Sequence, residues 1–338
     1  MSPGLWAPSA WVDGRWQDGV LLEVGADGRW TRVAAGLRCP SDAVRLEGPA
    51  LPGLVDAHSH AFQRAFAGLS ERRDDGRDDF WSWRDRMYQV AAQVGVDDVR
   101  AIASHLFHEL IEGGYTQVCE FHYLQHQPDG RAHGDPLAMA WALHDAARAS
   151  GIGLTLLPVL YERAGFTRPT LRPEQARFRL GADEVWEAVA RLRSVAHARF
   201  DAGLAIHSLR GASPRSIRRL VQRAQSWSGA IHIHVAEQTG EVDDCLAATG
   251  CRPIEWLLRE GVLDARWQLV HATHATPQEI DSVASSGAGV VICPGTEADL
   301  GDGLTDLAAW LDAGVRPSDE VKRGLRRFVP EYTAGPAD

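Results

Sequence analysis

The stretch LPGLVDAHSH at residues 51–60 is a short apolar run that ends in two histidines one residue apart. Residues i and i+2 of a β-strand project from the same face, so His58 and His60 can offer two imidazole nitrogens to one metal ion. Taken alone, the pair also fits two exposed histidines at a strand end. The rest of the chain decides between these interpretations.

Further along the chain, β-type runs alternate with helical patterns, which predicts parallel strand pairing. These runs are 116–123, 153–161, 203–209, 230–236, 267–272 and 289–294. With the strand before His58 they make seven. We therefore predict an α/β fold, a TIM-like (β/α)8 barrel over residues 49–315 that stops after about seven strands. In such a barrel the active site lies at the C-terminal ends of the strands.

Helix signals between these runs support the prediction. Residues 97–113 carry an apolar stripe at three- and four-residue spacing that ends at a glycine pair. Ser213 before a proline is typical of a helix start, and Thr276 with Glu279 matches a capping box. Residues 1–48 differ, because short strand-like pieces are separated by the turn dipeptides Asp13-Gly14, Asp18-Gly19 and Asp27-Gly28. They predict a small β-rich appendage.

Composition limits the class of protein. The 338 residues, 45% of them hydrophobic and 24% charged, can bury a large core. A net charge of −10 means that the chain has no excess of basic residues to attract an anionic partner. We therefore expect neither nucleic acid nor membrane as a partner. With no apolar run long enough to span a bilayer and no leader pattern at the N-terminus, the expected location is cytoplasmic. The five cysteines form no CxxC pair and suit reduced thiols.

Polar residues recur where the predicted strands end. After successive strands come His58 and His60, Glu120 and His122, His207 and Arg210, His232 with His234 and Glu237, His271, and Thr296 with Glu297. Any one of these fits a structural residue, but a barrel brings all of them to one mouth. His232 and His234 share a strand face, so spacing leaves open which of them completes a metal site.

The ordered set of motifs resembles the formimidoylglutamate deiminases of the amidohydrolase superfamily. The resemblance runs from about Trp6 to about Val315 and rests on HSHAFQR (58–64), FWSWR (80–84), EFHY (120–123), HSLR (207–210), HIHVAEQ (232–238), HATH (271–274) and TEADLGDG (296–303). It implies hydrolysis of N-formimino-L-glutamate to N-formyl-L-glutamate and ammonia, a step in histidine breakdown.

The resemblance also implies roles for individual residues. One zinc ion per chain would be held by His58, His60 and His234, with Glu237 as the acid/base group and His271 orienting or polarising the imine.

A small dicarboxylate substrate would be held by Arg210 and Arg84, with Gln63, Tyr123 and His207 as polar neighbours. Arg84 lies in an aromatic segment that alternatively packs as a helix or forms a subunit contact, so a homodimer is one expected assembly.

The family pattern is lost after Val315, where the superfamily has an eighth-strand aspartate that completes the metal shell. Asp319 is a weak stand-in, and it is better explained as the cap of a helix in the divergent tail, residues 316–338. A frameshift or a truncation would explain this loss. The alternatives to the deiminase are therefore an impaired or inactive truncated remnant, and a related amidohydrolase deaminase acting on another amidine or guanidine.

Overall fold

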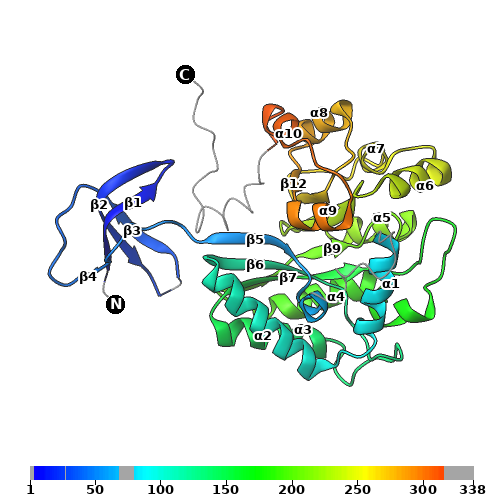
Figure 1. The fold of residues 1–338 in the computed structure, drawn as a ribbon, viewed down its shortest axis with the longest axis horizontal. Helices are drawn as coiled ribbons and strands as arrows, with labels where there is room; N and C mark the ends of the chain where they lie inside the picture. Colours follow the sequence, from blue (N-terminus) through cyan, green and yellow to red (C-terminus); the bar gives the residue numbers. More distant parts are fainter. Residues whose placement is uncertain (1–3, 27, 68–79, 316–338) are drawn as a thin grey trace.

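The computed structural model describes residues 4–26, 28–67 and 80–315. They form a small antiparallel sheet and a larger parallel sheet covered by helices, and strand β5 leads from the first to the second (Figure 1). The predicted TIM-like barrel architecture and the predicted β-rich appendage are both confirmed.

The small sheet has four strands in the order β3-β2-β1-β4. Its strands are β1 (Leu5–Val12), β2 (Arg15–Val24), β3 (Trp30–Ala34) and β4 (Val44–Arg45). Asp13 and Gly14 connect β1 to β2 with φ of 51° and 75°, which suits a two-residue hairpin turn. Ala7, Ala10 and Val20 form a separate small core.

The expectation of a turn at Asp18-Gly19 is wrong, because both residues lie inside β2. Gly19 has a φ of 58°, and a Cβ there would lie 2.4 Å from the carbonyl oxygen of Leu37. The glycine is therefore used for the close approach of another backbone segment, whose Leu37 N–H donates to the Gly19 carbonyl.

The larger sheet has eight parallel strands: seven follow the order β12-β11-β10-β9-β7-β6-β5, and β8 pairs with β7 off this path. The strands are β5 (Leu54–Ser59), β6 (Tyr115–His122), β7 (Gly153–Leu160), β8 (Phe200–Ala202), β9 (Leu204–Ile206), β10 (Ile231–Val235), β11 (Trp267–His271) and β12 (Gly289–Val291). All seven predicted strands are present. The short β8 was not predicted, because three residues with a central aspartate carry no strand pattern.

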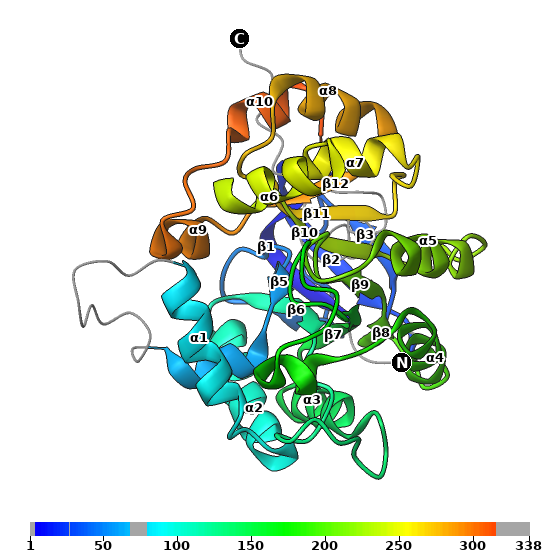
Figure 2. The same ribbon diagram turned by 90° about the vertical axis from the view of Figure 1, so that its right-hand side faces the viewer.

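Helices cover the outside of this sheet, as Figure 2 shows for α2, α3, α4, α5, α7 and α8. The helices are η1 (Ala61–Phe66), α1 (Phe80–Ala91), α2 (Val96–Glu112), α3 (Ala138–Ser150), η2 (Pro173–Phe178), α4 (Ala182–Arg193), α5 (Pro214–Arg223), α6 (Thr239–Thr249), α7 (Pro253–Arg259), α8 (Pro277–Ser286), α9 (Pro294–Leu300) and α10 (Leu307–Asp312). The predicted start signals are confirmed: the Ser213 side chain caps α5, and Thr276 and Glu279 form the capping box of α8.

Two hydrophobic clusters share the interior of the barrel. The first packs β6 and β7 against η1, α2 and α3, with Phe107 and Phe121 fully buried. The second packs β9, β10 and β11 against α5, α7 and α8, with Ile233 and Leu269 fully buried. The C-terminal ends of strands from both clusters meet above them, and this is where the polar residues gather.

Within the described ranges the larger sheet ends at β5 and β12, which are not paired with each other. The predicted stand-in ligand Asp319 lies outside the described residues. None of the helices described is both long enough and apolar enough to cross a bilayer.

Candidate metal centre and active site

Three histidine side chains converge at the strand ends. His58 lies in β5, His60 directly follows that strand, and His234 lies in β10. The Nε2 atom of His58 is 3.1 Å from Nε2 of His60 and 3.1 Å from Nε2 of His234. Period-two projection from β5 and parallel strand alignment therefore bring residues 176 positions apart to one point.

Backbone carbonyls fix the orientation of two of these rings. Nδ1 of His60 lies 2.9 Å from the carbonyl oxygen of Phe121, and Nδ1 of His234 lies 2.9 Å from that of His207. A carbonyl only accepts, so each Nδ1 carries the proton and donates. The Nε2 lone pairs are then directed at the shared point, as in histidines that ligate a metal.

Burial keeps these rings neutral. It lowers the pKa of His60 to about 4 and lowers the pKa values of His58 and His234 well below the usual range, and the neighbouring histidines lower them further. Three neutral imidazoles with converging lone pairs suit a divalent metal ion of the zinc type. The donor set of the site therefore fits a metal cofactor.

His232, which spacing could not distinguish from His234, is not one of the three grouped donors. Its side chain is buried, and neither ring nitrogen has a hydrogen-bond partner among the described residues. Burial lowers its pKa to about 4, so its ring is neutral.

His271 and Glu237 lie beside the three histidines. His271 ends β11 with a φ of 69°, and its ring stacks on His234 with centroids 5.5 Å apart. Its Nε2 is 3.5 Å from Oε1 of Glu237, and its Nδ1 is 3.2 Å from Oε1 of Glu297. Burial alone would lower the pKa of His271, but Glu237, Cys293 and Glu297 raise it well above the usual range. A proton can thus be held next to the converging histidines.

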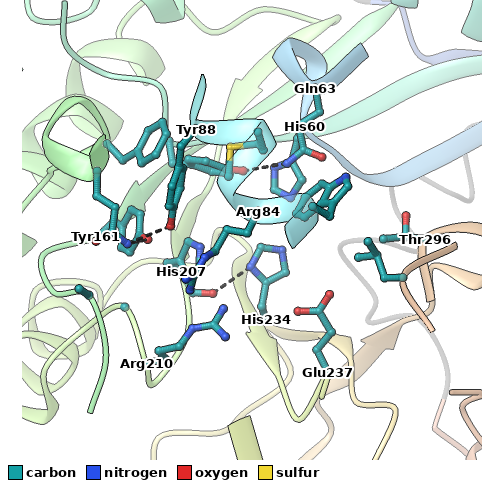
Figure 3. Close-up of a pocket in the computed structure, with 18 of the residues that line it drawn as sticks. His60, Gln63, Arg84, Tyr88, Tyr161, His207, Arg210, His234, Glu237 and Thr296 are labelled. Carbon is teal, nitrogen blue, oxygen red and sulfur yellow. Dashed lines mark hydrogen bonds between the residues drawn. The ribbon is translucent and has the colours of Figure 1, made fainter. Parts of the chain in front are cut away.

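One pocket is lined by all ten described residues to which the family resemblance gives a role: His58, His60, Gln63, Arg84, Tyr123, His207, Arg210, His234, Glu237 and His271. The strand-end residues Glu120, His122, His232 and Glu297 do not line it. Figure 3 shows the guanidinium ends of Arg84 and Arg210 on one side of His234, and Glu237 with Thr296 on the other. A small molecule in this pocket would meet cations at one end and Glu237 with His271 at the other.

The polar neighbours of the arginines form fixed contacts. Gln63 donates to the hydroxyl of Tyr123 at 2.8 Å, and the ring of Tyr161 stacks on His207 with centroids 4.2 Å apart. Burial lowers the pKa of His207 well below its usual range, and the charges of Arg210 and Arg84 lower it further. A neutral His207 therefore lies between the two cationic side chains.

Several residues at the pocket were not singled out from the sequence. Gln175 in η2 donates to the hydroxyls of Tyr88 and Tyr161, at 3.0 Å and 2.6 Å, and all three line the pocket. Tyr161 closes the predicted strand 153–161, so the strand-end rule could have found it. Gln175 carries no such signal, because η2 belongs to a long connection without strand or helix periodicity. Glu241, buried in α6, accepts the backbone N–H of Glu237 at 3.2 Å and was also missed.

The family follows from comparison with known proteins. The model of the amidohydrolase family matches residues 50–319, which include the strand ends described above. The chain therefore belongs to the amidohydrolase family.

Individual relatives show which members of the family the chain is similar to. The chain is 42% identical over 316 residues to formimidoylglutamate deiminase from Pseudomonas aeruginosa, a match covering 92% of this chain and 69% of that protein. It is 28% identical to a 5-methylthioadenosine/S-adenosylhomocysteine deaminase from Haloarcula marismortui, over 80% of this chain and 56% of that protein. The chain thus spans little more than half the length of the second relative.

Solved structures agree on the fold. An amidohydrolase from Brucella melitensis superposes with a TM-score of 0.87 at 36% identity, covering 93% of this chain and 70% of that one. Atrazine chlorohydrolase from Arthrobacter aurescens, solved in complex with zinc, gives a TM-score of 0.74 at 20% identity, covering 92% of this chain and 70% of that one. At 20% identity, the match to atrazine chlorohydrolase supports a shared fold and nothing further.

Proposed function

We propose that this chain hydrolyses N-formimino-L-glutamate to N-formyl-L-glutamate and ammonia, with one zinc ion held by His58, His60 and His234. The observation that carries the proposal is the placement of two arginines in the same pocket as the histidine cluster and the Glu237–His271 pair. The 42% identity to a formimidoylglutamate deiminase supports the choice of substrate.

The substrate carries two carboxylates and a formimino group at its amine end. Arg84 and Arg210 would each pair with a carboxylate, since a guanidinium offers parallel N–H donors to such a group. Gln63, Tyr123 and His207 would fix the skeleton between them. The formimino carbon then lies next to His234, between the arginines and Glu237.

The reaction adds water to the formimino carbon and breaks its bond to the terminal nitrogen. Zinc, when bound, would lower the pKa of a water toward about 7 and so supply hydroxide at neutral pH. Both protons of the water end on the departing nitrogen, which leaves as ammonia while the carbon keeps the oxygen as a formyl group. Glu237 is suited to relay these protons, because its carboxyl lies at the mouth of the pocket beside His271.

His271 would act on the imine nitrogen. Its Nε2 faces Glu237 and the pocket, so a proton on Nε2 can be donated to the imine and make the carbon more electrophilic. The same hydrogen bond holds the substrate in line with Glu237.

A ring-amidine or guanidine deaminase is the second candidate, since relatives of the chain include 5-methylthioadenosine/S-adenosylhomocysteine deaminases. The cationic side chains of Arg84, Arg163 and Arg210 in the pocket favour an acidic substrate over a neutral nucleoside. We also propose a cytoplasmic location, supported by five cysteines that are all free thiols.

The test is ammonia release by the purified, zinc-loaded full chain. We expect turnover with N-formimino-L-glutamate and at least a 100-fold lower kcat/KM with N-formiminoglycine, which lacks the second carboxylate. Preference for S-adenosylhomocysteine would favour the second candidate. Monodisperse protein that holds a full zinc equivalent and releases no ammonia from any of these would support the inactive remnant instead.

A further inference from the structure

Glu297 is a buried carboxylate that does not line the pocket, although its neighbours Thr296 and Leu300 on the same helix do. Only 1% of its surface is exposed. Its Oε1 accepts the backbone N–H of Cys293 at 2.9 Å and lies 3.2 Å from Nδ1 of His271. A carboxylate removed from water in this way must be held by its hydrogen bonds.

The two nitrogens of His271 thus face two different carboxylates. Nε2 faces Glu237 at 3.5 Å, on the pocket side, and Nδ1 faces Glu297, on the side away from the pocket. Oε1 of Glu297 already accepts the backbone N–H of Cys293, so Nδ1 of His271 carries the proton and donates it to that oxygen. The His271 ring cannot flip without losing this hydrogen bond. Nε2 therefore stays on the pocket side, where it can act on the substrate.

The backbone around His271 makes such an anchor necessary. His271 and Ala272 have φ of 69° and 47°, values that non-glycine residues seldom adopt. Thr305 donates to the carbonyl oxygen of His271 at 3.2 Å, so a second contact secures the same residue. The ring is therefore held from behind by the Glu297 carboxylate and the Cys293 side chain, and at its backbone by one hydroxyl.

We propose that Glu297 is a positioning residue for the hydrolysis: it holds the His271 ring with Nδ1 turned away and Nε2 directed at the substrate. This inference rests on the proposed function and adds a residue to its machinery. Glu297 itself touches no reacting atom, and it acts only through His271.

Because Glu297 acts through His271, removal of both side chains should cost no more than removal of His271 alone. We expect Glu297→Ala to lower kcat roughly 100-fold with KM changed less than threefold. Glu297→Gln should lose less than tenfold, since an amide oxygen can still accept both hydrogen bonds. The double variant Glu297→Ala/His271→Ala should match His271→Ala within about twofold.

A matched control is available in Glu279, another buried carboxylate near a helix start, which accepts from Thr276 and Arg252 and lies outside the pocket. Glu279→Gln should keep kcat. Zinc content and melting temperature of each variant show whether it has folded. If Glu297→Ala does not fold, Glu297→Gln keeps the test decisive.

A readout independent of turnover is the proton on Nδ1 of His271. In zinc-loaded protein labelled with [15N]histidine, we expect a low-field proton signal that is lost in Glu297→Ala and His271→Asn but kept in Glu297→Gln. This signal tests the contact even if the wild-type chain releases no ammonia, which separates failure of the inference from failure of the proposed function.

Three results would overturn the inference. The first is a low-field signal that survives in Glu297→Ala. The second is a double variant that multiplies the two single losses. The third concerns metal, since donors of His271, Cys293 and Glu297 also lie within 4.8 Å of one another. A second Co²⁺ equivalent with a thiolate charge-transfer band that Cys293→Ser removes would mean that these residues bind metal instead.

Discussion

The two sides of the pocket are built differently. The histidine side comes from strand ends, and its rings are tied to the backbone carbonyls of Phe121 and His207. The arginine side comes from helix α1, which carries Arg84, and from the segment after β9, which carries Arg210. Strand geometry thus fixes the chemistry, whereas the residues that would select the substrate extend as long side chains from less regular parts of the fold.

The largest effect should come from the histidine side. We expect His234→Ala to bind less than a tenth of the wild-type zinc and to lose roughly a thousand-fold or more in kcat/KM, because one of three ligands is removed. Zinc content and ammonia release measure this. His232→Gln is the matched control two residues away, and it should keep its zinc. Loss of zinc in His232→Gln with retention in His234→Ala would reverse the assignment of the ligand.

The arginine side should respond in binding rather than in metal content. Arg210→Ala removes charge-assisted hydrogen bonds worth about 1.5–3 kcal/mol, so KM for N-formimino-L-glutamate should rise roughly 10- to 150-fold with zinc still bound. Arg84→Ala should raise KM by a smaller factor. Arg218→Ala, at an exposed ion pair with Glu260, serves as control. An unchanged KM in Arg210→Ala would remove that residue from the site.

Acidification should separate the two sides without mutation. The neutral imidazole binds metal and protons compete for it, so a lowered pKa moves metal loss to lower pH. With the pKa of His60 lowered to about 4, and those of His58 and His234 lowered well below their usual range, zinc should be retained at pH 6 and lost toward pH 4. Zinc content after dialysis across this range measures it. Half-loss near pH 6.5 would show that the histidines titrate as if exposed.

The smallest effect on activity should come from the β-rich appendage, which contributes to neither side. Gly19→Ala puts a Cβ 2.4 Å from the Leu37 carbonyl and should destabilise the small sheet by about 1–3 kcal/mol. Gly14→Ala, at a φ of 75° with open space around it, isolates the cost of the backbone conformation. Thermal melting should distinguish the two variants, with kcat equal in both. A lower kcat in Gly19→Ala alone would show that the appendage does contribute to the pocket.

The contrast between the two sides also explains what the sequence could reveal. Period-two projection and parallel pairing are local rules, so the amino-acid sequence alone is enough to place His58, His60 and His271 at one mouth. The seven strands of the sheet path were predicted for the same reason. The substrate-binding roles proposed for Arg84 and Arg210 rest on the family resemblance, because no periodicity says where a long side chain on a helix or connection will point.

Other features depend on tertiary contacts and carried no local signal. The dipeptide Asp18-Gly19 is typical of a turn, but Gly19 lies in the middle of β2, where the backbone of Leu37 approaches closely. Glu297 follows the last strand like other strand-end residues, yet its carboxylate turns behind His271 rather than into the pocket. Strand spacing likewise could not choose His234 over His232, since both share one strand face and only the folded arrangement separates them.

The metal centre also lies on the seam between the two hydrophobic clusters. His60 directly precedes η1, whose Ala61 and Phe62 belong to the first cluster, and His234 lies in β10, whose Ile233 and Val235 belong to the second. One bound ion would therefore link two halves of the barrel that otherwise contact each other through strand pairing and packing. We expect chelation to speed amide hydrogen exchange in β5 and β10 first, while α3 and α8 stay protected. Equal acceleration throughout would show that the ion stabilises the barrel without joining its halves.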